Sequence, residues 1–164
     1  MKKMILVVLG LLIFTACNEK EKTDAIVMGE DEMLESPTGE ASVIAVSTIQ
    51  NDAGVSFTVS LRSPDTGCGQ YADWWEVITE DGELLNRRIL AHSHVNEQPF
   101  ARSGSVFPLE ESLTVIIRGH MNNSGYGTAV FKGSINAGFD KTTIDKDFAK
   151  ELANQQPLPN NCAF

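Results

Sequence analysis

The most constraining feature of this sequence is a stretch in which apolar and polar residues alternate strictly. From residue 55 to residue 62, apolar side chains occupy the odd positions and polar ones the even positions. A period of two places neighbouring side chains on opposite faces of a strand, so one face is buried and the other meets solvent. Residues 42–50 are rich in Val, Ile and Thr, and the turn 51–54 joins them to the alternating segment. The two segments therefore predict an antiparallel hairpin.

A second hairpin is predicted over residues 74–94, around a turn at Asp81-Gly82. This dipeptide is a strong two-residue turn signal, and it fixes which residues face each other. With Glu80 opposite Glu83, the turn predicts an ion pair and a cation–π pair across the strands. The predicted cross-strand pairs are Ile78 with Leu85, Val77 with Asn86, Glu76 with Arg87, Trp75 with Arg88, and Trp74 with Ile89.

Further strands are predicted at residues 105–109, 113–121 and 128–135, with turn-rich segments between them. One helix is predicted at about residues 143–154, because Ile144, Phe148 and Leu152 recur at every fourth position until Pro157. Strands do not alternate with helices, which excludes a doubly wound nucleotide-binding fold. We expect a mostly β protein, an antiparallel β-sandwich of immunoglobulin-like or related type. Its C-terminal helix would cover a sheet edge or an open end.

The N-terminus carries the pattern of an export signal. Lys2 and Lys3 precede an apolar core, residues 4–14, that is too short to span a bilayer. Residues 14–17, Phe-Thr-Ala-Cys, resemble the lipobox of bacterial lipoproteins. The resemblance implies that residues 1–16 are removed and that Cys17 is acylated, with palmitate among the attached groups. It also implies a lipid-anchored place in the bacterial cell envelope. Asn18 follows the cysteine, which favours the outer membrane.

Residues 17–40 are predicted to be an acidic flexible tether, and residues 41–164 the folded domain. Between residues 18 and 40 there are eight acidic residues and two lysines, without a sustained apolar period. Such a segment buries too little surface to offset its ordering entropy. Because an exported chain matures in an oxidising compartment, Cys68 and Cys162 are predicted to form a disulfide.

The charge balance excludes one class of partner. The chain has 22 acidic and 13 basic residues, and its basic runs, Lys2-Lys3 and Arg87-Arg88, are no longer than two residues. No basic cluster is available to displace counterions from phosphates, so no nucleic-acid binding is expected.

The three histidines suggest a transition-metal site. His92 and His94 are two positions apart on a predicted strand and so share a face, while His120 lies on another strand. Imidazoles from two strands are the ligand set of many Zn and Cu sites. Glu97 and Met121 are candidate further ligands, with Tyr71 and Asp73 close by. The alternative is a polar, hydrogen-bonded face that binds no metal and also includes Trp75 and Arg88.

The same stretch resembles the first motif of the cupin family, in which His-x-His is followed by Glu and later by Gly. The corresponding residues are His92, His94, Glu97 and Gly104, with His120 as the later histidine. The resemblance implies a metal-dependent oxygenase or isomerase.

A non-enzymatic binding or interaction module is the leading functional hypothesis, without a required cofactor. The chain has no Gly-x-Ser-x-Gly motif, and its serines lie in turns without a nearby His-Asp pattern. Exposed aromatic residues would provide a contact surface for a protein, a peptide or a glycan. The candidate surface residues are Tyr71, Asp73, Trp74, Trp75, Arg88 and Phe100.

Overall fold

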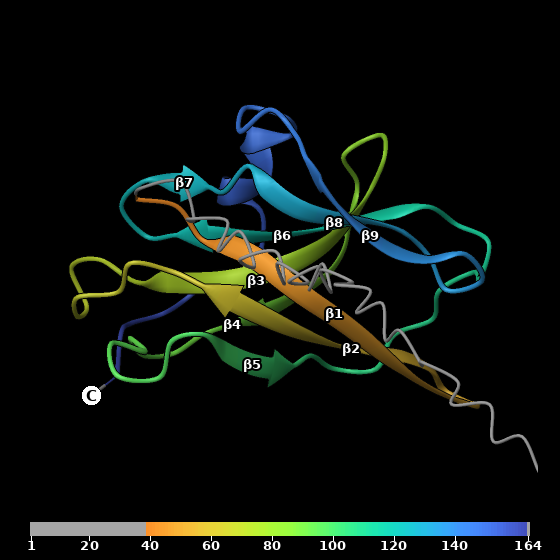
Figure 1. The fold of residues 1–164 in the computed structure, drawn as a ribbon, viewed down its shortest axis with the longest axis horizontal. Helices are drawn as coiled ribbons and strands as arrows, with labels where there is room; N and C mark the ends of the chain where they lie inside the picture. The colour runs from red at the N-terminus through yellow and green to blue at the C-terminus, as the bar shows by residue number, and fades with distance from the viewer. Residues whose placement is uncertain (1–38, 164) are drawn as a thin grey trace, which may run out of the picture. The chain divides into compact units, whose positions relative to one another are not determined.

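The computed structural model describes residues 39–163, and these residues form two antiparallel sheets (Figure 1). The smaller sheet has the strand order β1-β2-β5. The larger sheet has the order β4-β3-β6-β8-β9, and β7 pairs with β6. The strands are β1 (Ser42–Asn51), β2 (Gly54–Arg62), β3 (Ala72–Thr79), β4 (Leu84–Ile89), β5 (Phe100–Ser103), β6 (Val115–Met121), β7 (Gly125–Tyr126), β8 (Ala129–Ser134) and β9 (Gly138–Thr143). The mostly β prediction is confirmed, and the two sheets fit a sandwich.

Three predictions for the N-terminal region lie outside the described residues: the signal peptide 1–16, the acylated Cys17, and the tether 17–40 up to residue 38. Within residues 39–163 there is no helix of the length and hydropathy needed to cross a membrane.

The main core lies between the two sheets. The alternating segment forms β2, and its four apolar side chains are all buried. They belong to one cluster with apolar residues of β3 and β6 from the larger sheet. The cluster includes Val55, Phe57, Val59 and Leu61 from β2, Trp75 and Val77 from β3, and Val115, Ile117 and Met121 from β6. The period of two in the sequence therefore identifies the inner face correctly.

A second core lies on the other face of the larger sheet, where the C-terminal segment packs (Figure 1). Trp74, Ile78 and Ile116 point to this face. The C-terminal segment covers them with Ile144, Phe148 and Leu152. The spacing of these three residues predicted a helix with one buried face. They pack against the sheet as expected, but the backbone that carries them is not an α-helix.

The predicted helix 143–154 is wrong: the segment holds one short 3₁₀ helix, η1 (Lys150–Asn154). Ala149, just before it, has a left-handed backbone with φ of 48°, which a continuous α-helix does not allow. The position is also different, because the segment lies on a sheet face rather than at an edge or an open end. The physical reason is a pair of arginines that bind the backbone carbonyls of this segment.

These arginines flank Glu76, which is fully buried at the centre of β3. The sheet register places Glu76 opposite Arg87 on β4 and Arg118 on β6. Arg87 Nε donates to Glu76 Oε2 and Arg118 Nε donates to Oε1, each at 2.8 Å. None of the three side chains has any exposed area. A buried charge without its partner is strongly destabilising, so each member of this triad requires the others.

The remaining guanidinium N–H groups of the triad hold the C-terminal segment. Their acceptors are the backbone carbonyls of Leu152, Gln155 and Pro157 for Arg87, and of Phe148 and Ala149 for Arg118. The flat faces of the guanidinium groups are also covered, by the Trp74 ring at 4.6 Å and the Tyr126 ring at 3.5 Å. Carbonyls bound to side chains in this way no longer need the successive intrahelical hydrogen bonds of an α-helix.

The predicted disulfide is confirmed. Cys68 and Cys162 are bonded, with their Cα atoms 5.6 Å apart and a sequence separation of 94. The bond ties the loop before β3 to the chain beyond η1. The C-terminal segment is therefore held along residues 148–157 by the triad and beyond them by the disulfide.

The second hairpin has the predicted register close to its middle and departs from it at both ends. Trp74, Trp75 and Glu76 face Ile89, Arg88 and Arg87, and Val77 faces Asn86, as predicted. A bulge after Val77 then pairs Ile78 with Leu84 instead of Leu85. The cation–π contact joins Arg87 to Trp74 rather than Arg88 to Trp75. The return strand ends at Ile89, so the loop that follows it, and not a strand, carries His92 and His94.

Two strands, β7 and β9, were missed, and one was misplaced. The predicted strand 105–109 is a single bridge between Phe107 and Val55, because Pro108 has no N–H to continue a ladder. The strand of that region is β5, earlier in the chain, and β9 was not predicted at all.

The triad gives a stability prediction. Glu76→Gln removes the negative charge and leaves two buried guanidinium groups without their counter-charge. We expect the free energy of unfolding to fall by about 3–5 kcal/mol. Urea unfolding of the disulfide-bonded protein measures it. Glu80→Gln is the matched control, because it breaks an exposed pair with Lys132 and should cost less than about 1 kcal/mol. Equal effects of the two substitutions would contradict a dominant role for the triad.

Candidate functional site

The three histidines do not form one site. Across residues 39–163, no three or more His, Cys, Asp or Glu side chains are placed to hold a metal ion together. His92 and His94 lie in the loop after β4, with ring centroids 4.5 Å apart, while His120 is in β6 beside Asp73. The predicted Zn or Cu set of His92, His94, His120, Glu97 and Met121 is therefore not assembled. The cupin-like ligand set is not assembled for the same reason.

His94 belongs to a buried structural cluster. Its ring stacks on Phe100 with centroids 3.7 Å apart, and its backbone N–H donates to Asp65 Oδ2 at 2.7 Å. Asp65 Oδ1 accepts from the backbone N–H of Ala72, so this carboxylate joins the loop to the start of β3. Both ring nitrogens of His94 are buried without a hydrogen-bond partner among the described residues. Burial lowers the pKa of His94, and Arg102 and then His92 add to this effect.

The side chains of the other two candidate ligands, Met121 and Glu97, make other contacts. Met121 is fully buried in the core between the sheets. It follows His120 directly on β6, and successive residues of a strand point to opposite faces, so the two side chains cannot approach one ion. Glu97 pairs with Arg102, its carboxylate accepting from both NH groups at 3.1 and 2.8 Å.

The aromatic contact surface predicted from the sequence is not formed. Tyr71, Asp73, Trp74, Trp75 and Phe100 are all buried, and Arg88 alone of the candidate set is exposed. The physical reason is that the larger sheet is covered on both faces. Trp75 packs between the sheets, and Trp74 packs under the C-terminal segment.

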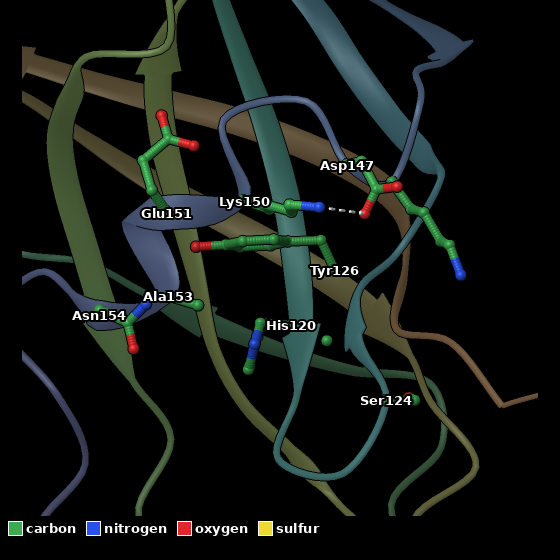
Figure 2. Close-up of a pocket in the computed structure, with 10 residues that line it drawn as sticks. His120, Ser124, Tyr126, Asp147, Lys150, Glu151, Ala153 and Asn154 are labelled. Carbon is green, nitrogen blue, oxygen red and sulfur yellow. Dashed lines mark ion pairs between the residues drawn. The ribbon is translucent and has the colours of Figure 1, made fainter.

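A pocket of ≈ 520 Å³ lies where the C-terminal segment meets the end of the larger sheet. Figure 2 shows that its walls come from two parts of the chain, the β6–β7 hairpin and the segment around η1. The hairpin supplies His120, Ser124, Gly125 and Tyr126, and the C-terminal segment supplies Lys146, Asp147, Lys150, Glu151, Ala153 and Asn154. The triad and the disulfide that hold the segment therefore also hold one wall of this pocket.

His120 is the most constrained polar group of the pocket. Its Nδ1 is 2.7 Å from Asp73 Oδ1. The ring stacks on Trp74 with centroids 3.6 Å apart, and Tyr126 meets it edge-on at 4.8 Å. Its other nitrogen, Nε2, has no hydrogen-bond partner among the described residues and, unlike the ring nitrogens of His94, is not fully buried. The imidazole is thus fixed in orientation by Asp73, Trp74 and Tyr126 in the lining of the pocket.

Asp73 holds this ring from a buried position. Burial raises the pKa of Asp73, and the hydrogen bond with His120 opposes that rise. A carboxylate behind an imidazole sets the orientation and the tautomer of the ring. The sequence analysis placed Asp73 near the histidines, and the structure confirms its contact with one of them, His120.

The rim of the pocket carries both signs of charge. Lys146 and Lys150 face it together with Asp147 and Glu151, and Lys150 Nζ is 3.6 Å from Asp147 Oδ1. The hydroxyl of Ser124 donates to the carbonyl of Gly39 and is not hydrogen-bonded to His120. His120 is therefore held in a fixed orientation. In the part of the lining that the structure describes, no hydroxyl group that could act as a nucleophile is hydrogen-bonded to it.

Of the residues that line this pocket, only His120 was singled out from the sequence. The segment that carries the lysines, the acids and Asn154 was predicted to be a helix. The only local signal was the apolar repeat of Ile144, Phe148 and Leu152, which shows that the segment packs on something but not on what.

The comparisons with known proteins give one relative. The chain is 42% identical over 100 residues to a protein of Halomicrobium mukohataei named "Putative lipoprotein". The match covers 60% of this chain and 49% of that protein, so the chain spans about half the length of this curated relative. No family model and no solved structure matches the chain.

His94 gives a prediction about acid stability. Its pKa is lowered in the folded state, so the unfolded chain binds a proton more readily. Its contribution to stability is therefore complete above about pH 6.5, the ordinary value for histidine, and decreases as the pH falls below it. His94→Phe keeps the ring stacking and should remove that part of the acid loss.

Urea unfolding between pH 7.5 and pH 5 measures the effect. Asn96→Gln, in an exposed position two residues later, is the control and should keep the slope of the parent protein. An unchanged slope in His94→Phe would show that other groups govern the acid response.

Proposed function

We propose that this chain is a lipid-anchored protein of the cell envelope that binds a small polar ligand in the His120 pocket. The anchoring part is supported by the Phe-Thr-Ala-Cys sequence at residues 14–17 and by the relative named a lipoprotein. The relative comes from Halomicrobium mukohataei and does not support the more specific outer-membrane address suggested by Asn18. The proposal is therefore limited to a membrane anchor at Cys17.

The binding part rests on one observation, the fixed His120 in the lining of the pocket. Asp73 and Trp74 hold the imidazole, so binding through Nε2 needs no reordering of that side chain. The lysines and acids of the rim, with Asn154, suit a hydroxyl-rich or zwitterionic molecule. Saccharides and short peptides are the ligand classes that fit.

Binding rather than catalysis is favoured by the surroundings of His120. Nucleophilic catalysis needs a hydroxyl or thiol within hydrogen-bond reach of the base. Ser124, the one hydroxyl residue of the described lining besides Tyr126, bonds to Gly39 instead. The Tyr126 hydroxyl is itself buried, and burial raises its pKa.

The anchor is tested by the mass of the mature protein. We expect the chain purified from membranes to begin at Cys17 and to carry a lipid increment. Cys17→Ser should release the protein from the membrane fraction or leave the precursor unprocessed. Intact-mass spectrometry checks both. A mature mass without the lipid increment would end the anchoring proposal and leave the pocket unaffected.

The pocket is tested by protein-observed NMR with panels of mono- and disaccharides and of dipeptides. Bound ligands should shift the amide signals of residues 124–126 and 146–154. His120→Gln loses the oriented imidazole and should weaken binding about tenfold or more, as expected for a hydrogen bond worth over 1.4 kcal/mol. His92→Gln is the matched control outside the pocket. Shifts elsewhere, or affinity that His120→Gln leaves intact, would contradict the assignment.

A further inference from the structure

The edge strands of the two sheets differ in how well they are protected from pairing with a further strand. An edge strand presents unpaired backbone groups to which another strand can bond, and proteins commonly block such edges with charged side chains. The edges of the two sheets are β1, β5, β4 and β9. β5 carries Arg102, β4 carries the exposed Arg88, and β9 carries Asp140 and Lys141. β1 is the longest of the four, with 10 residues, and has no charged residue, proline or glycine.

The accessible part of β1 is its C-terminal part. Ser42 and Val43 are buried, and a register shift follows before Ala45. From there Ala45, Ser47 and Ile49 alternate as exposed residues, and Ile49 is 70% exposed, the highest value among large apolar residues of the described chain. Within residues 39–163, the backbone of residues 45–51 is hydrogen-bonded to β2 and to no other strand.

We propose that residues 45–49 of β1 pair antiparallel with the same segment of a second copy of this chain, about a two-fold axis at Ser47. In this register Ser47 faces its own copy and Ile49 faces Ala45, so the exposed isoleucine gains an apolar cross-strand neighbour. A two-fold contact is closed, which gives a dimer rather than a fibre. The two three-stranded sheets then form one continuous sheet.

Charge favours a second copy as the occupant of this edge. The chain has 22 acidic and 13 basic residues, so most surfaces of two copies repel each other. Like charges placed opposite each other across strands are destabilising, and the charge-free β1 avoids this. β1 belongs to the smaller sheet, whereas the His120 pocket is built on the larger one. Pairing therefore depends on neither the pocket nor its ligand.

Cysteine cross-linking tests this pairing in the full chain in its own membrane. Ser47→Cys places one thiol at the two-fold axis, where paired strands bring the Cβ atoms close enough for a disulfide. After oxidation with copper phenanthroline, we expect a band at twice the monomer mass on non-reducing gels. Thr143→Cys, at an exposed position of the β9 edge, is the control and should give about a tenth of that band or less. Equal or absent cross-linking in the two variants would overturn the proposal.

A second variant separates pairing from chance collisions. Ile49→Lys adds the kind of charge that blocks the other edges, and it changes a side chain that is already exposed. Combined with Ser47→Cys, it should reduce the cross-linked dimer about tenfold, while Thr143→Lys should leave it unchanged. Unchanged cross-linking with Ile49→Lys would overturn the proposal. Cross-links from Ser47→Cys to a different protein in place of the dimer would also overturn it.

Discussion

The buried carboxylate of Glu76 is the interaction on which the C-terminal part of this structure depends. Glu76 lies on β3, between Arg87 of β4 and Arg118 of β6. All three charged side chains are buried. Two guanidinium groups on one carboxylate leave N–H groups to satisfy, and the C-terminal segment satisfies them with backbone carbonyls. A hydrophobic cluster then forms around the charges. The segment is thus held on the sheet by polar and apolar contacts together.

Sequence reasoning was reliable where one local signal decided the outcome. The Asp81-Gly82 turn fixed the middle of the second hairpin, and with it the contact of Glu76 with Arg87. The contact of Glu76 with Arg118 could not be predicted in this way. The strand on the other side of β3 depends on the topology of the whole sheet, and no local turn determines it. The same limit explains the predicted helix. The repeat of apolar residues was real, but the arginines that replace intrahelical hydrogen bonds come from strands far away in the sequence.

The candidate site, too, could be predicted from the sequence only in part. Extending β4 as far as His94 placed two histidines on a strand, whereas the strand ends at Ile89 and the loop turns His94 into a buried cluster with Asp65 and Phe100. The alternation of faces along β6 already separates His120 from Met121, and that signal was available in the sequence. The pocket itself was not predictable, because one of its walls is the C-terminal segment in a conformation that only the packed structure reveals.

The central claim is that the C-terminal segment is a fixed wall of the pocket, held by the triad and the disulfide. Hydrogen exchange read by mass spectrometry on the full disulfide-bonded chain tests it directly. The protected amides should include those of Phe148, Leu152 and Gln155, which donate to carbonyls inside the segment. Exchange of the peptides covering residues 145–156 should then be slowed to a degree comparable with β6. Exchange as fast as in an unstructured peptide would show that the segment is not docked, and the account of the pocket would fail with it.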